Sequence, residues 1–200
     1  QLNSTATESW FKERRIEAEW TVYDRTTGNY AASTVTALGT NYPISNKYYI
    51  TLTPTTSSGI SKLFVKFPLP NTLSAKYNVY CVFVPTAIAD TSDKRPYKVK
   101  FYLSYKDANG AQVTDKGVTL TNTLAASTSQ IGTFTTNPST MTKMLVLKDF
   151  QFPFSNLMYT EDTPITVSLK VENAANPSGT DLVNFNRTVR IDCIILEPVQ

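Results

Sequence analysis

The stretch that decides the fold is Arg190-Ile191-Asp192-Cys193-Ile194-Ile195-Leu196-Glu197-Pro198, close to the end of the 200-residue chain. It is short, rich in β-branched residues, apolar at both odd and even positions, and it ends at a proline. Such a run is typical of a strand that is buried on both faces in the middle of a sheet. Its best match within the chain is residues 76–85, KYNVYCVFVP, which have the same proline stop and a cysteine in the same phase. The sequence therefore predicts two central strands around which the rest of the chain closes.

Further strands are predicted outward from these two runs, because apolar and polar residues alternate with a period of two. They cover residues 15–23, 47–53, 61–67, 97–105, 112–120, 130–135, 141–147 and 165–171. Residues 24–45, 148–164 and 173–186 read as polar or aromatic loops, and Asn109-Gly110 has the chemistry of a hairpin turn. The pattern predicts an all-β fold of about nine or ten strands, a two-sheet antiparallel β-sandwich of the jelly-roll type. We expect one such domain over residues 15–200, after a polar N-terminal segment at residues 1–14.

The segment at residues 9–20 supports two interpretations. It is rich in helix formers, so propensity alone predicts a helix. With a period of two, Ile16, Ala18 and Trp20 share one face, while Glu17 and Glu19 share the other. We expect the strand at residues 15–23, with a helical turn before it.

The composition excludes several classes of function. The chain has no histidine, which removes histidine-based triads and histidine-ligated zinc sites. Charged residues make up 18% and the net charge is +3, with no basic cluster that would indicate a nucleic acid as partner. No apolar run of eighteen residues is present that would span a membrane.

The two cysteines, Cys81 and Cys193, each lie inside an apolar predicted strand. They can be two buried free thiols, since free cysteine is among the most buried residue types. They can also form a disulfide between neighbouring strands, which would indicate an oxidising compartment. The sequence leaves both alternatives open, because it does not fix the separation of the two Cα atoms.

Several segments carry a family resemblance. Residues 61–70, SKLFVKFPLP, together with residues 76–85 and 190–198, resemble the C-terminal β-sandwich found with fasciclin-type domains in surface lipoproteins of glycan-degrading gut bacteria. More broadly, the chain looks like the galactose-binding-like jelly roll of family 6 and family 35 carbohydrate-binding modules. These typically open with a Glu-Ala-Glu strand, here Ile16-Glu17-Ala18-Glu19, and close with Ile-Asp-x-Ile, here Ile191-Asp192-Cys193-Ile194. The resemblance implies a non-catalytic module that is extracellular or on the outer cell surface and is lipid-anchored through a preceding N-terminal region.

The same resemblance implies a structural calcium ion. In such modules the opening-strand glutamate and the closing-strand aspartate hold it together, and here these are Glu17 or Glu19 with Asp192. Ca²⁺ takes several hard oxygen ligands, so backbone carbonyls and water would complete the site. The alternative is that these carboxylates are solvated strand charges or partners of nearby arginines. No other cofactor is expected.

A carbohydrate surface needs aromatic faces beside hydrogen-bonding groups. Two loops offer both kinds of group, and their candidate residues are Phe152, Phe154, Asn156 and Tyr159 in the first loop and Asn184, Phe185 and Asn186 in the second. The resemblance adds that family members often place a sugar-contacting asparagine in the second loop. The alternative for Phe152 and Phe154 is that they plug the end of the sandwich, since phenylalanine usually lies inside.

These observations predict a non-catalytic carbohydrate-binding or adhesion module. The alternative function is a structural module that packs against a neighbouring fasciclin-like surface domain and has no ligand of its own. An enzyme is not expected, because the carboxylate pairs in the loops are close neighbours in sequence, whereas the two carboxylates of a glycosidase are usually far apart in sequence.

Overall fold

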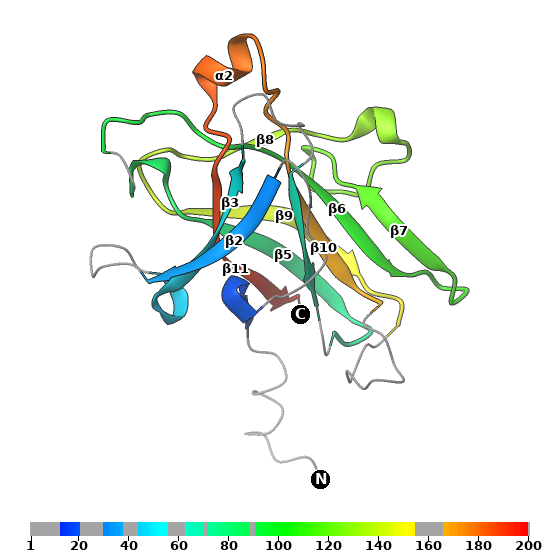
Figure 1. Ribbon diagram of the computed structural model, residues 1–200. Coiled ribbons are helices and arrows are strands. Elements are labelled where there is room, and N and C mark those ends of the chain that lie inside the picture. The colour runs from blue at the N-terminus through cyan, green and yellow to red at the C-terminus, as the bar shows by residue number, and fades with distance from the viewer. Residues whose placement is uncertain are drawn as a thin grey trace.

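The computed structural model describes residues 13–20, 30–37, 44–55, 63–69, 72–88, 91–154 and 166–199. For Trp20 and residues 30–37 only the backbone is described. Two antiparallel sheets face each other and form a jelly-roll β-sandwich (Figure 1). The predicted fold class is confirmed. The predicted residues Asn156 and Tyr159 lie outside the described residues.

The first sheet has six strands in the order β2-β3-β11-β5-β9, and β1 pairs with β11 as well. The strands are β1 Arg14–Glu17, β2 Tyr30–Ala37, β3 Tyr48–Pro54, β5 Lys76–Phe83, β9 Thr142–Gln151 and β11 Val189–Pro198. The predicted central pair is confirmed, because β11 and β5 are neighbours in the interior of this sheet. The seven residues of β11 that are buried include the whole run from Ile191 to Leu196, as its apolar residues on both faces require.

The second sheet has five strands in the order β4-β10-β6-β7, and the short β8 pairs with β6. The strands are β4 Phe64–Pro68, β6 Lys98–Lys106, β7 Gln112–Gly117, β8 Phe134–Thr135 and β10 Ser168–Asn173. Helical segments are short: η1 Ala18–Trp20, η2 Ser45–Lys47, η3 Thr86–Ile88, η4 Thr128–Gln130 and α2 Thr180–Asn184. No helix in the described part of the chain is long and apolar enough to span a membrane.

The core lies between the two sheets and is built from the alternate, inward-facing side chains of both. Aromatic rings connect the sheets: Phe83 on β5 and Phe101 on β6 have ring centroids 6.2 Å apart. Phe101 also packs edge-on against Phe134 on β8, at 5.0 Å. These side chains are nearly inaccessible to solvent and fix the spacing of the layers.

Four expectations about the elements were wrong. The opening strand ends at Glu17, and residues 18–20 form the 3₁₀ turn η1 instead of continuing the strand. β2 runs through residues expected to be a loop, and β9 extends to Gln151 in another expected loop. The short α2 interrupts the third expected loop.

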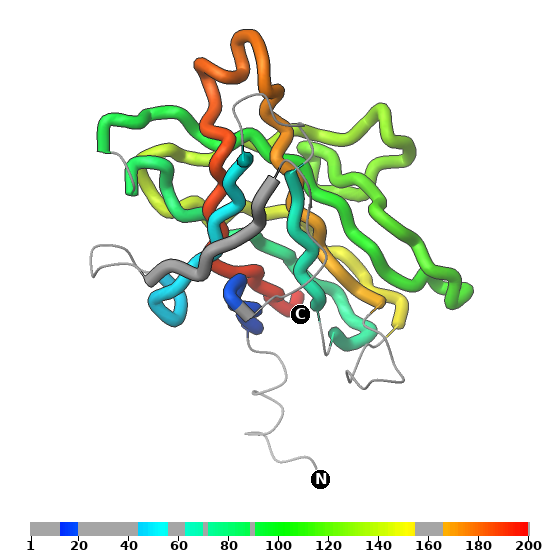
Figure 2. The backbone as a smooth tube through the Cα atoms, viewed as in Figure 1, coloured from blue at the N-terminus to red at the C-terminus, as the bar shows by residue number. Residues whose placement is uncertain are grey.

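The N-terminal and C-terminal strands lie side by side (Figure 2). β1 and β3 pair one after the other along the same edge of β11, with Glu17 opposite Cys193 and Ile50 opposite Ile191. Asp192 therefore lies where one partner strand of β11 gives way to the next. This junction positions the first candidate site.

Candidate functional site

A β-bulge shapes the junction. On β11, Ile191 is paired with Phe83 and Cys193 with Val82, so Asp192 is the extra residue between two consecutive partners on β5. A β-bulge changes the direction of nearby side chains, so that they no longer alternate strictly between the two faces of the sheet. It allows Asp192 and its neighbour Cys193 to serve the same small site together with Glu17.

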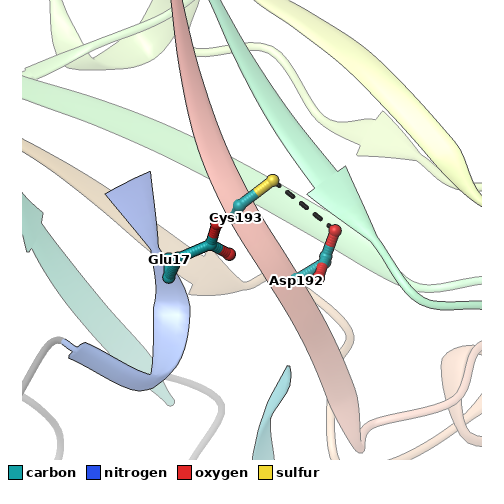
Figure 3. A group of neighbouring side chains, drawn as sticks. All are labelled: Glu17, Asp192 and Cys193. Carbon is teal, nitrogen blue, oxygen red and sulfur yellow. Dashed lines mark hydrogen bonds between the residues drawn. The ribbon is translucent and has the colours of Figure 1, made fainter. Parts of the chain in front are cut away.

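Glu17, Asp192 and Cys193 form a compact cluster, which we term the acid–thiol cluster (Figure 3). One ligand atom of each residue lies within 4.8 Å of those of the other two. The three residues are 7%, 2% and 1% exposed, respectively. Two carboxylates and a thiol are thus brought together out of contact with bulk water.

Ser45, in η2 just before β3, connects the two carboxylates. Its backbone N–H donates to Asp192 Oδ1 at 3.0 Å and to Oδ2 at 3.3 Å. Its hydroxyl donates to Glu17 Oε1 and accepts from Arg15 Nη1 at 3.3 Å. Glu17 Oε2 is buried and has no hydrogen-bond partner among the described residues. A buried carboxylate oxygen without a hydrogen bond is energetically costly.

The electrostatics of the acid–thiol cluster follow from its burial. Burial raises the pKa of Asp192 to about 6; the Ser45 N–H opposes this rise and the negative charge of Glu17 adds to it. Burial is also the main reason why the pKa of Cys193 is raised, and Asp192 adds to that shift. The guanidinium of Arg15 lowers the pKa of both groups. In the absence of another cation, the thiol therefore keeps its proton at neutral pH.

The predicted calcium ligands are only partly brought together. Glu17 and Asp192 meet, but Glu19 lies beyond the end of β1 in η1, where its Oε1 accepts a hydrogen bond from Asn46 Nδ2 at 2.8 Å. The expectation that Glu17 and Glu19 share one strand face was wrong, because the strand ends between them. The donor set does not fit calcium well, since calcium prefers six to eight oxygens and the third group here is a thiol. Calcium binding itself stays a prediction.

Cys81 and Cys193 are free thiols in this structure, so the disulfide alternative is wrong. Cys193 is paired with Val82, whereas Cys81 is paired with Ile194, one position along. Paired residues share a face and successive residues alternate, so the two cysteine side chains leave opposite faces of the sheet. Cys81 accordingly belongs to the core between the sheets, while Cys193 packs with Val82 and Ile195.

A second candidate site, the end pocket, lies where β3 ends and the chain passes from α2 into β11. It has a volume of about 270 Å³. Its walls come from three separate segments and comprise Thr53, Pro54, Thr55, Arg95, Leu182, Phe185, Asn186, Arg187 and Thr188. Of the predicted sugar-binding residues, Phe185 and Asn186 line it, and Asn184 is exposed beside them in α2 without lining it. The arginine and threonine lining was missed, because no local motif marks residues that only the fold brings together.

Asn186 holds the wall of the end pocket in place. Its side-chain N–H donates to Asp93 Oδ2 at 2.9 Å, and its side-chain oxygen accepts from the Thr188 N–H at 2.9 Å. Arg95 donates to both oxygens of Asp93 and, at 3.2 Å, to the carbonyl of Leu182. These bonds hold the pKa of Asp93 below its usual value, with the Arg95 side chain as the largest cause. The asparagine thus fixes the backbone of the pocket, and its amide is largely occupied in doing so.

Phe185 is the aromatic member of the lining. It is partly exposed, and Lys98 Nζ lies 5.1 Å from its ring centroid. The same ammonium donates to Asp181 Oδ2 at 2.9 Å, which ties α2 to β6. The ring is therefore held in position by a cation on one side while it remains accessible from the pocket.

The other predicted aromatic loop lies at the opposite end of the sandwich. Gln151 pairs with Lys76 at the start of β5, whereas the α2–β11 connection lies near Phe83 at its end, about 23 Å away along the strand. Figure 1 shows this separation between α2 and the far end of β9. The two predicted halves of a carbohydrate surface therefore do not form one site.

Phe152 was predicted as a sugar-binding residue, and this was wrong. Its side chain is 1% exposed, because it packs edge-on against Tyr77 and Phe150 at 5.7 and 4.9 Å between ring centroids. It plugs the end of the core, as the alternative interpretation held. Phe154 is 44% exposed and does not line the end pocket.

Comparisons with known proteins give one weak structural likeness. No protein-family model matches the chain, and no curated protein matches it either. Among solved structures, the chain is similar to a family 35 carbohydrate-binding module from Clostridium thermocellum, with 12% identity and a TM-score of 0.39. The match covers 94% of this chain and 99% of the module. A likeness at this TM-score says nothing about what the chain binds, and the predicted fasciclin lipoprotein context stays a prediction.

Proposed function

We propose that the chain is a non-catalytic glycan-binding module and that the end pocket receives the ligand. The observation that carries this proposal is the lining of the pocket. It combines the Phe185 ring with the threonine hydroxyls at positions 53, 55 and 188 and with two arginines. A sugar offers an apolar ring face and several hydroxyls, and this lining supplies a partner for each.

The size of the end pocket suits a small part of a glycan. At about 270 Å³ it is slightly smaller than pockets that enclose drug-sized ligands, which run from roughly 300 to 1,000 Å³. A terminal sugar ring fits such a volume, while the rest of the chain of sugars extends into solvent. We propose accordingly that the module recognises glycan ends, outside the cell, in adhesion or in glycan capture.

A catalytic role is not supported by this pocket. Its lining, as far as the chain is described, contains no carboxylate that could act as acid, base or nucleophile. The nearby Asp93 is bonded by Arg95 and Asn186 and supports the wall from behind. Binding without chemistry is what this arrangement can do.

The test is binding to a broad panel of immobilised neutral and acidic glycans, followed by titration calorimetry with the best ligand. Phe185→Ala removes the ring and is expected to weaken binding roughly three- to ten-fold, the equivalent of about 1 kcal/mol for an aromatic contact. The matched control is Phe154→Ala, which removes an exposed phenylalanine at the other end of the sandwich and should leave the affinity unchanged.

Two results would overturn the proposal. One is an equal loss in both variants, or a loss in Phe154→Ala alone, which would place the ligand elsewhere. The other is a blank panel with protein shown to be folded by circular dichroism. That outcome would leave the alternative of a structural module that packs against a neighbouring surface domain.

A further inference from the structure

We propose that Glu17, Asp192 and Cys193 form a binding site for a thiophilic divalent metal ion of the zinc class, which joins the N-terminal strand to the C-terminal strand. The three donors come from the two ends of the chain, since Glu17 lies on β1 and the other two lie on β11. A bound ion would therefore act as a staple between strands that are remote in sequence. This site is separate from the end pocket.

The spacing of the donors fits a tetrahedral ion. With Zn–S near 2.3 Å and Zn–O near 2.0 Å, a tetrahedral angle sets sulfur and oxygen about 3.5 Å apart. Cys193 Sγ donates a hydrogen bond to Asp192 Oδ2 at 3.5 Å, and all three ligand atoms lie within 4.8 Å of one another, so an ion could replace the thiol proton without a change in this spacing. The three residues would supply three ligands of a tetrahedral ion, and water would supply the fourth.

An independent observation points into the same site. Glu17 is 7% exposed, and its Oε2 has no hydrogen-bond partner among the described residues, although its Oε1 accepts from Ser45. Figure 3 shows the carboxylate directed toward β11, where Asp192 and Cys193 lie. An ion between them would satisfy the oxygen that the described part of the chain leaves unpaired.

The thiol decides the class of ion. Thiolate is a soft ligand that selects zinc and related metals, whereas calcium takes hard oxygens in larger number. The ion would balance two of the three negative charges of two carboxylates and a thiolate, and Arg15, which also pairs with Glu13 Oε1 at 3.1 Å, lies beside them. Arg15 lies close enough to donate to Ser45, at 3.3 Å. Binding would deprotonate Cys193, as metal coordination of a thiol requires.

The direct test uses the full chain after treatment with EDTA. Co²⁺ reports a thiolate ligand through its sulfur-to-metal charge-transfer absorption in the near ultraviolet, and Zn²⁺ should then displace it. We expect this band in the unmodified chain and in Cys81→Ser, the matched control whose thiol lies on the other face of the sheet. In Cys193→Ser the band should vanish and Zn²⁺ affinity should fall on the order of 100-fold.

Glu17→Gln provides a second variant that keeps the shape of the side chain. It should retain the band and bind Zn²⁺ at least about ten-fold more weakly. A Co²⁺ spectrum of the unmodified chain without the charge-transfer band would overturn the proposal, and so would Zn²⁺ binding that Cys193→Ser leaves unchanged. A larger rise of the melting temperature with Ca²⁺ than with Zn²⁺ at equal concentration would overturn it in favour of an oxygen-only site.

Discussion

The buried carboxyl of Asp192 makes the stability of the metal-free chain depend on pH in a defined direction. Its pKa in the folded state is about 6, compared with an ordinary value of 3.8. Below pH 3.8 both the folded and the unfolded chain carry the proton, so Asp192 does not lower the free energy of unfolding. Between pH 3.8 and 6 the unfolded chain loses the proton first, and stability falls as pH rises. Above about pH 6 the loss is complete and constant.

The size of this effect follows from the shift. A change from 3.8 to about 6 corresponds to up to about 3 kcal/mol of stability lost between pH 4 and pH 8. The perturbation is Asp192→Asn, which keeps the shape of the side chain and one acceptor for the Ser45 N–H but cannot ionise. We expect the variant to gain stability relative to the unmodified chain as pH rises, by up to this amount.

The assay is urea unfolding of both chains in EDTA from pH 4 to pH 8, with the free energy of unfolding extrapolated to water. The difference between the two chains at a single pH includes any change in hydrogen bonding to Ser45. Its change with pH reports the ionisation of residue 192. Two pH profiles that run parallel, or a variant that loses stability as pH rises, would refute the assignment of a raised pKa to Asp192.

Three further predictions rest on particular side chains. Phe152→Ala should lower the free energy of unfolding by about 3–5 kcal/mol, because it empties a packed site, whereas Phe154→Ala should change it by only about 0.5 kcal/mol in chemical denaturation. Alkylation in denaturant without reductant, read by mass spectrometry, should label both Cys81 and Cys193; an unlabelled pair would contradict the free thiols. Gly110→Ala should cost about 1 kcal/mol in the same unfolding assay, because Gly110 has a φ of 80° although a Cβ there would meet no atom within 4 Å; no loss would contradict the left-handed turn.

The central strands could be predicted because their sequence is unambiguous. A run that is apolar at every position, as at Ile194, Ile195 and Leu196, can be satisfied only where both faces of a strand are covered. β2 could not be predicted in the same way. Its sequence, YAASTVTA, contains mainly small and hydroxyl side chains, and it pairs with β3 at the edge of the sheet, where such residues are tolerated.

The candidate sites depended on features that strand periodicity does not report. The bulge at Asp192 arises from the pairing of β11 with β5. Its signal is visible only in the structure: Ile191 and Ile194 both face the core, and a spacing of three between inward residues requires an extra residue in the strand. The 3₁₀ turn that separates Glu19 from Glu17 gave no signal in the sequence, because Ala18 and Trp20 fit an alternating strand equally well.

Only some of the residues that line the end pocket could be predicted from the sequence. Phe185 and Asn186 could be found as an aromatic beside an amide in a loop. Their partners Thr53 and Arg95 come from distant segments, one at the end of β3 and one before β6, and become neighbours only in the folded chain. Conversely, Phe152 and Phe154 are also aromatic residues in a predicted loop, but they lie at the far end of the sandwich. There Phe152 packs in the hydrophobic core. The sequence indicated residue types that could bind a sugar, and the fold determines which of these residues lie together in one site.

The measurement that tests the central claim most directly is a heteronuclear NMR titration of the ¹⁵N-labelled chain with the best ligand from the glycan panel. Binding in the end pocket predicts that the largest amide shift changes fall at residues 53–55 and 182–188, with little change near Phe154. Shift changes that gather at the far end of the sandwich, or on a sheet face away from the pocket, would contradict the account.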